Sequence, residues 1–483
     1  MKAAMLRRIS PLAVLFAVAA LSGGCTAASE EEEAEVAAGE LNSALDDPNK
    51  GVHTDALLVM RDGKVLSESY GRGYDADTKH LSWSMAKTVA GILVAQEIDR
   101  GTMSLSSPIR NYLPEVQSPA RVVDVLQMSS GIAFNEEYSG VPVSSDATRM
   151  LYMDGPKTGV LPFLAKLPQR TDAKPGEHFY YSSGDSNLLM AALRNVAPTQ
   201  RAYDAIPFER FFKPLGISSA TFEQDSKGVF VGSSYIYLKA RDFGKIGSLL
   251  VERGKRGGET IIPGWYFDLM SRVAPGASSK ALAGTSQTRA YSSQVTTNLP
   301  IPARGLPSEY ADLPTDALLM IGHQGQLVVA SPSQKLVIVR LAMDKGSSFD
   351  RKQFFAKVVR LVEAKSGSLL TARKENPAHY AGAPPAPAPD AAAEGAKIAD
   401  YLEVPHLIRA LAAKEFCSCI KVVGRSEDEC KDDLRVSLPV LPTLRVNDEV
   451  GSVSAVPGTG LFGKKSVAVY RGPELGCTLT ESE

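Results

Sequence analysis

The chain has 483 residues, which is long enough for two or three domains. Its 53 basic and 54 acidic residues nearly cancel, and no basic block interrupts the sequence. This charge balance argues against nucleic acid as a partner.

The first residues predict an export signal. Lys2, Arg7 and Arg8 precede an apolar run over residues 11–21. Because this run is too short to span a bilayer, it is typical of a signal peptide, which we place at residues 1–24.

The end of the apolar run predicts a lipid anchor. The segment from Leu21 to Cys25 resembles a bacterial lipobox, although the leucine stands four residues before the cysteine instead of three. We therefore expect Cys25 to carry a lipid that holds the protein in the bacterial cell envelope, at the outer membrane on its periplasmic or surface side. A soluble secreted protein is the alternative. The acidic and Ala-rich residues 25–50 predict a flexible tether.

Strand patterns occur at both ends of residues 51–373, which we assign to one domain. A β-hairpin with an Asp-Gly turn is predicted over residues 56–70. The later predicted elements are strands over 317–321, 326–330 and 336–341 and an amphipathic helix over 349–364. The expected fold class is therefore α+β, with one antiparallel sheet flanked by helices and a largely helical insertion between the strands.

A continuous apolar run over residues 85–95 predicts a helix buried on most sides. Ser84 and Lys87 stand at its start, three residues apart and so on one face. Burial favours the neutral amine, which can take a proton from a serine hydroxyl. The same spacing recurs at Ser418 and Lys421, where the neighbouring residues predict a strand. Spacing alone therefore leaves open an N-cap serine with a snorkelling lysine.

The C-terminal part of the chain follows a Pro/Ala-rich linker over residues 374–397. Residues 398–483 predict a helix over 398–415 and then a strand-like tail, which together form a small accessory module. Its cysteines predict two disulfides in an oxidising compartment, with three pairings open and Cys417–Cys419 the least expected. These four cysteines are Cys417, Cys419, Cys430 and Cys477.

Three polar motifs together resemble a known family. Ser84-x-x-Lys87, Tyr181-Ser-Ser183 and His323-Gln-Gly325 have the order of the motifs Ser-x-x-Lys, Tyr-x-Asn and Lys-Thr/Ser-Gly of the serine β-lactamase and penicillin-binding superfamily. The closer likeness is to class C β-lactamase-like hydrolases, which include the 6-aminohexanoate-dimer hydrolases and related esterases. Six phrases over residues 55–364 carry it: ALLVMRDGKVL, LSWSMAKT, VLQMSSG, YSSGDSNLL, VGSSY and GHQGQ. A β-lactamase/DD-peptidase-like fold is what this resemblance implies.

The resemblance also implies roles for individual residues. Ser84 would attack a carbonyl, Lys87 would take its proton, and Tyr181 would relay a proton to the leaving group. The backbone N–H groups of Ser84 and Gln326 would form the oxyanion hole. An ordinary core tyrosine is the alternative reading of Tyr181. The residues expected to bind the substrate or its oxyanion are Ser183, His323, Gly325 and Gln326. No metal or cofactor is expected.

Two departures from the β-lactamase pattern change the expected substrate. Ser183 replaces asparagine, and His323 replaces a lysine that would help to hold a substrate carboxylate. Because histidine is mostly neutral at pH 7, we expect a serine hydrolase that acts through an acyl-enzyme on small neutral esters or amides. A β-lactamase or DD-carboxypeptidase, acting on β-lactam-like substrates, is the enzymatic alternative. A catalytically silent lipoprotein that binds peptidoglycan is the alternative of another class. His80, one turn before the nucleophile, is expected to be structural.

The phrases CSCIKVVGRS and AVYRGPELGCTL in the tail resemble a segment that precedes the catalytic domain in some related hydrolases. This likeness implies an accessory piece that packs against the hydrolase. An independent disulfide-bonded module is the alternative.

Overall fold

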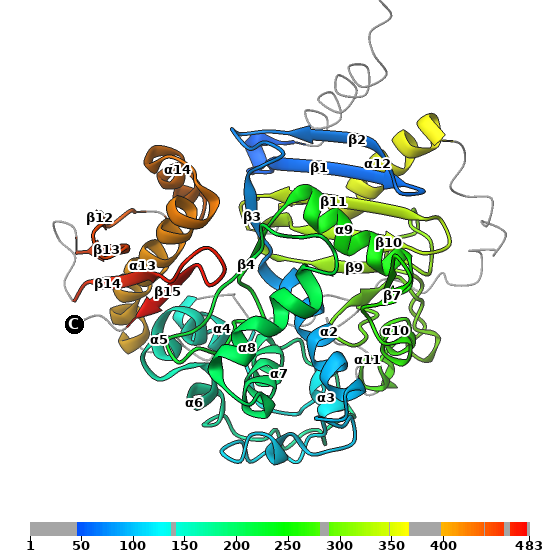
Figure 1. Cartoon of the computed structure of the whole chain (residues 1–483), viewed down its shortest axis with the longest axis horizontal. Coiled ribbons are helices and arrows are strands. Elements are labelled where there is room, and N and C mark those ends of the chain that lie inside the picture. The colour runs from blue at the N-terminus through cyan, green and yellow to red at the C-terminus, as the bar shows by residue number, and fades with distance from the viewer. Residues whose placement is uncertain are drawn as a thin grey trace, which may run out of the picture.

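The structure is a computed structural model, shown in Figure 1, that describes residues 46–136, 142–280, 289–346, 348–366, 398–438, 440–457 and 464–480. The predicted signal peptide, Cys25, most of the tether and the linker lie outside the described residues. Among the described residues, no helix is both long enough and apolar enough to cross a membrane.

A six-stranded antiparallel sheet joins the two ends of the main domain, which we define as residues 46–366 (Figure 1). Strand β1 pairs with β2 and also with β11, so that Leu58 lies opposite both Glu68 and Val339. The expected sheet from both ends of the domain is confirmed. In spatial order the strands are β2 (Lys64–Tyr70), β1 (Thr54–Arg61), β11 (Leu336–Ala342), β10 (Leu327–Ser331), β9 (Leu318–Ile321) and β8 (Thr296–Thr297).

Both faces of this sheet are buried because alternate side chains meet different helices. Leu57 and Val59 pack against α12 (Arg351–Ser366). Leu58 belongs to the larger core on the opposite face, where α9 (Ala240–Val251) covers β10 and β11. The helix lies close to the sheet, since a side chain on Gly247 would collide with Val337.

Helices and loops form the insertion between the strands. Helix α2 (Ala86–Asp99) is buried along most of its length and packs against α7 (Ser183–Val196). The buried helix predicted after Ser84 is therefore confirmed. The other helices of the main domain are η2 (Pro48–Lys50), η3 (Trp83–Met85), η4 (Ile109–Asn111), α3 (Val122–Leu126), η5 (Pro142–Ser144), α4 (Asp146–Thr148), η6 (Arg149–Met153), α5 (Asp154–Thr158), α6 (Val160–Leu164), α8 (Gln200–Pro207), η7 (Phe208–Phe212), α10 (Gly264–Met270), α11 (Pro275–Ser278), η9 (Pro302–Arg304) and η10 (His323–Gly325).

Two small sheets complete the main domain. The first has the order β3-β5-β4 and lies beside the start of α2, and the second is the pair β6-β7. Their strands are β3 (Lys79–Leu81), β4 (Thr221–Phe222), β5 (Ile236–Lys239), β6 (Lys255–Arg256) and β7 (Glu259–Thr260).

The C-terminal module, residues 398–480, consists of helices packed on a four-stranded antiparallel sheet. It is stabilised by the disulfides Cys417–Cys477 and Cys419–Cys430, so the expected number of bridges is present. Its elements are α13 (Ile398–Ser418), η12 (Cys419–Val423), α14 (Glu427–Ser437), β12 (Thr443–Asn447), β13 (Ser452–Val456), β14 (Ser466–Tyr470) and β15 (Cys477–Thr480).

The strand predicted around Ser418 and Lys421 is wrong, because both residues are helical. β-Branched neighbours favoured a strand, but this propensity is weak beside tertiary packing. Phe416 and Cys417 are buried in a core that α13 shares with β14 and the main domain, and this packing extends the helix.

The module packs directly against the main domain. Tyr152 and Tyr235 of the main domain share one hydrophobic core with Phe416 and Leu434 of the module. The backbone also joins the two parts, since the Phe222 N–H donates to the Glu474 carbonyl at 2.8 Å. These contacts favour the packed accessory piece over an independent module.

Candidate active site

The turn before α2 positions the predicted nucleophile. Trp83, directly before Ser84, has a φ of 44°. This left-handed conformation is strained for a bulky residue and persists only where the surroundings hold it. The Ser82 hydroxyl is hydrogen-bonded to the carbonyl of Ser234 at 2.9 Å and accepts from the Ile236 N–H at 3.2 Å. Strand β5 therefore fixes the turn that presents Ser84.

Lys87 lies at the centre of the site and is only 1 % exposed. Its Nζ is 3.0 Å from the Ser84 Oγ, 2.9 Å from the Ser183 Oγ and 3.0 Å from the Ser233 carbonyl oxygen. The structure thus brings together Ser84, Lys87 and Ser183, as the motifs predicted. The carbonyl of Ser233 was not predicted, although it lies in the phrase VGSSY.

Glu136 is a further partner that the sequence did not indicate. Its carboxylate accepts hydrogen bonds from the Ser183 N–H at 2.8 Å and from the Ser183 hydroxyl at 2.7 Å. Glu136 lies in a loop 47 residues before Ser183, and no motif marks it.

Two hydrogens of the Lys87 amine can be assigned to hydrogen bonds, because two of its partners can only accept from it. A carbonyl oxygen such as that of Ser233 can only accept, and so can the ionised carboxylate of Glu136. Since the Ser183 hydroxyl donates to Glu136, it must accept from Lys87. The remaining direction of Nζ faces the Ser84 hydroxyl, and in a neutral amine this direction carries the lone pair.

Tyr181 contacts Lys87 through its ring. The Nζ lies 5.0 Å from the ring centroid, and the Tyr291 ring packs edge-on at 5.9 Å on another side. Within the described part of the chain, no hydrogen bond joins the Tyr181 hydroxyl to Ser84 or Lys87. The predicted tyrosine is therefore in place beside the lysine, without the hydrogen bond that a relay would use. Such bonds often tighten only when substrate binds.

The loop of η10 places His323 beside Trp83, the residue before Ser84. The His323 ring lies edge-on to the Trp83 ring at 5.5 Å, and desolvation by the surrounding protein lowers the pKa of His323. The imidazole is therefore neutral at pH 7, as expected from the sequence. Its accessible surface faces a cavity that it lines together with Ser84.

Buried contacts hold this loop. Gly325 has a φ of 86°, and a side chain there would collide with Asp344 and Arg340. The buried Arg340 guanidinium donates to the Gly325 carbonyl at 3.1 Å and forms an ion pair with Asp344. The Gln326 N–H points to the His323 carbonyl at a long 3.5 Å. To bind an oxyanion, the Gln326 N–H would have to give up this weak contact with the His323 carbonyl.

Two buried carboxylates lie near the site. The Asp55 carboxylate accepts a hydrogen bond from His80 Nε2 at 2.9 Å, so His80 is a packed structural residue as expected. Asp185, in the first turn of α7, accepts from the Ser130 hydroxyl at 2.7 Å, and burial raises its pKa to about 7. Neither carboxylate contacts Ser84.

A cavity of about 340 Å³ opens beside Ser84. Trp83, Ser183, Ser234 and His323 of the main domain contribute to its lining, and side chains of the C-terminal module form another part of its wall. Tyr235, the residue after Ser234, lies in the core shared with the module. In the ranges that the structure describes, no cluster of His, Cys, Asp and Glu side chains is arranged to hold a metal ion.

Comparison with known proteins identifies the class. The family model described as Beta-lactamase matches residues 33–359, about two thirds of the chain. The chain therefore belongs to the beta-lactamase family of serine hydrolases. It is 29 % identical over 249 residues to the 6-aminohexanoate-dimer hydrolase of Paenarthrobacter ureafaciens. This match covers 49 % of this chain and 61 % of that hydrolase, so the chain spans about three fifths of the relative's length.

Solved structures share the fold at low sequence identity. A putative beta-lactamase from Bacteroides dorei DSM 17855 has a TM-score of 0.52 and 17 % identity, over 67 % of this chain and 98 % of its own. EstCE1, a hydrolase with promiscuous acyltransferase activity, has a TM-score of 0.52 and 15 % identity, over 67 % of this chain and 97 % of its own. SurE with D-Leu has a TM-score of 0.50 and 16 % identity, over 93 % of this chain and 97 % of its own. The β-lactamase-like α+β fold expected from the sequence is confirmed.

Proposed function

We propose that this protein hydrolyses small neutral esters or amides through an acyl-enzyme on Ser84. The observation that carries the proposal is the arrangement around Lys87. Ser183 and the Ser233 carbonyl take two of its hydrogens, and Nζ lies 3.0 Å from the Ser84 Oγ, so that the lone pair of a neutral Lys87 would face the Ser84 hydroxyl. A serine with a positioned, buried amine is an activated nucleophile.

In the proposed reaction, Lys87 takes the hydroxyl proton as the Ser84 Oγ bonds to the substrate carbonyl carbon. The N–H groups of Ser84 and Gln326 stabilise the oxyanion. The bond to the alcohol or amine then breaks, and this leaving group receives the proton from Lys87 through Tyr181. A water molecule attacks the acyl-enzyme by the same route, which releases the acid and restores Ser84.

The neutral His323 supports an uncharged substrate. A fixed cation at this position would favour a carboxylate, whereas a neutral imidazole offers a hydrogen bond and no charge. The names of two similar proteins, 6-aminohexanoate-dimer hydrolase and EstCE1, a hydrolase with promiscuous acyltransferase activity, support hydrolysis as the reaction.

An active-site phosphonate tests the proposed nucleophile. Mass spectrometry should find a covalent adduct on Ser84 in the wild type and none in Ser84→Ala. Ser84→Ala and Lys87→Ala should lose esterase activity to nearly the same extent, because residues that act as one unit are not additive. A wild type without an adduct would instead support a silent peptidoglycan-binding protein.

A panel of chromogenic neutral esters and a chromogenic cephalosporin tests the substrate class. We expect wild type to cleave the esters faster, and His323→Lys to improve cephalosporin turnover relative to ester turnover. Faster cephalosporin cleavage by wild type would favour the β-lactamase alternative.

We also propose that the protein is exported and held in the cell envelope by a lipid on Cys25. The segment from Leu21 to Cys25 and the signal-like run before it support this proposal.

A further inference from the structure

The cavity beside Ser84 has a wall that the main domain does not supply. Four apolar side chains of the C-terminal module line it, together with the disulfide-bonded Cys419 and Cys430. These apolar side chains are Leu407 and Leu411 of α13, Val423 of η12 and Leu434 of α14. The module therefore contributes surface directly to the space in which a substrate of Ser84 would lie.

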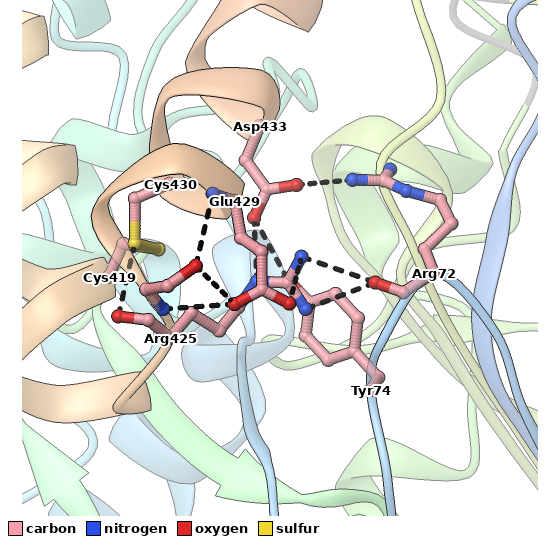
Figure 2. The surroundings of a disulfide bond; sticks show 8 residues. Arg72, Tyr74, Cys419, Arg425, Glu429, Cys430 and Asp433 are labelled. Atoms are coloured by element: carbon pink, nitrogen blue, oxygen red, sulfur yellow. Dashed lines mark hydrogen bonds and ion pairs between the residues drawn. A yellow bond between two sulfur atoms is a disulfide. The ribbon is translucent and has the colours of Figure 1, made fainter.

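Buried ionic contacts hold this wall against the main domain (Figure 2). Asp433 of α14 pairs with Arg72 across the boundary. The Arg425 guanidinium donates to the Arg72 carbonyl at 3.2 Å and stacks on the Tyr74 ring at 4.2 Å. Asp433 also pairs with Arg425 at 3.3 Å, and Arg72 with Asp55 at 3.6 Å, so the contact across the boundary belongs to a network of charges. Opening the boundary would separate the two ends of this partly buried network, which costs free energy.

The module is also connected to the loop that carries His323. The Gln324 amide donates to the Ser437 hydroxyl at 2.9 Å and accepts from the Trp83 indole at 3.0 Å. Gln324 therefore links the last turn of α14 to the residue that precedes the nucleophile. The module's part of the cavity wall is thus held in place by two contacts, the ion pair with Arg72 and the hydrogen bond with Gln324.

The lining of the cavity offers little positive charge to an anionic ligand. Lys79 is the one lysine or arginine among the lining side chains within the described ranges. Of the two acids in the lining, Asp433 is paired with Arg72 and Arg425, and burial raises the pKa of Glu415. Lys79 donates to the Thr221 hydroxyl at 3.0 Å, and desolvation lowers its pKa. Within the described part of the chain, the cavity lining therefore has no strongly basic side chain that is free to pair with a substrate carboxylate.

We propose that the C-terminal module determines specificity, and that Leu407, Leu411, Val423 and Leu434 bind an uncharged apolar substituent of the substrate. The inference rests on the proposed hydrolysis at Ser84. A volume of about 340 Å³ is at the lower end of the range for ligand pockets. The substituent is therefore compact, and lengthening it beyond the space available abolishes the gain from burial.

Leu411→Trp tests the wall by filling part of the cavity. Val450→Trp is the matched control, since Val450 belongs to the same module but is 63 % exposed and does not line the cavity. The substrates form two series: p-nitrophenyl esters from acetate to octanoate, and acetate esters of alcohols from ethanol to octanol.

In the wild type, kcat/KM should rise by about fourfold for each buried CH₂ in one of the two series, until the cavity is full. Leu411→Trp should lower kcat/KM at least tenfold for the longer members of that series and less than about threefold for the shortest. Leu411→Ala should move the optimum to longer chains, and Val450→Trp should keep the wild-type profile. If Leu411→Trp changes all members of both series equally, the module does not contact the substituent and the inference is overturned.

Binding separates this inference from the proposed hydrolysis. In a Ser84→Ala background, calorimetry with the intact p-nitrophenyl and alkyl esters should show tighter binding of longer members, and Leu411→Trp should remove that trend. If the wild type forms no phosphonate adduct but this trend is present, hydrolysis at Ser84 is wrong and the apolar wall stands. If an adduct forms but Leu411→Trp leaves the trend unchanged, hydrolysis stands and the wall assignment is wrong.

Discussion

Tyr181 and Ser183 both lie beside Lys87, but they contact it in different ways. The Ser183 hydroxyl accepts a hydrogen bond from Nζ, whereas Tyr181 presents the face of its ring. We expect Tyr181→Phe to reduce the rate of ester cleavage by about 10²–10⁴, which is the usual contribution of an acid–base group. Ser183→Ala should cost only about tenfold, because the Ser233 carbonyl still orients the amine. Steady-state kinetics on one p-nitrophenyl ester measure both losses, and a reversed order would assign the proton relay to Ser183 and Glu136.

Asp185 makes the stability of the protein depend on pH. Burial raises its pKa from 3.8 to about 7, so the folded protein holds this proton at pH values where the unfolded chain has lost it. The stabilising contribution is full below about pH 4 and is lost as the pH rises to about 7. Urea unfolding should therefore show a free energy of unfolding that falls between pH 5 and pH 7.5 by up to a few kcal/mol. Asp185→Asn keeps the acceptor for Ser130 and should flatten this dependence; an equal slope in both proteins would contradict the assignment.

At the scale of elements, the bridge between Cys419 and Cys430 joins η12 to α14, and both helices line the cavity. The bridge closes a loop with a sequence separation of 11. Replacing both cysteines by serine should lower the free energy of unfolding by about 3 kcal/mol, because the unfolded chain regains the entropy of that loop. Urea titration of the double variant measures the loss.

Disulfide mapping by mass spectrometry without reduction provides the control for this prediction. It should recover the peptides that link Cys417 to Cys477 and Cys419 to Cys430, with no free thiol among them. Recovery of other pairs, or four cysteines that alkylate without reduction, would contradict the structure.

The sequence was most informative where function depends on local spacing. Ser84 and Lys87 are three residues apart on one helical turn, so their contact follows from helix geometry. The hairpin and the later strands could be predicted from the alternation of apolar and polar residues and from the turn residues between them. Glu136 could not be predicted, because a loop residue meets Ser183 only through the tertiary fold. Single-sequence propensity also failed at Ser418 and Lys421, where burial against the main domain extends a helix.

At the scale of the whole molecule, the proposed lipid anchor predicts where the enzyme is found. Labelling of cells with a radioactive fatty acid should mark the wild type. Cys25→Ala should remove the label and release the protein from membranes, because one lipidated residue carries the attachment. An unlabelled, soluble wild type would show that the segment from Leu21 to Cys25 is not recognised, which is the secreted alternative.

The shared core of the two parts also sets an order of events during synthesis. Ser84, Lys87 and the central sheet are made first. The module's part of the cavity lining lies within residues 407–437 and is linked by a disulfide to Cys477 at the start of β15. A nascent chain that has completed only the main domain leaves the apolar side of that cavity open to water. The lining of the pocket is therefore complete only after the module has been made through β15, so the proposed specificity is acquired at the last stage of synthesis.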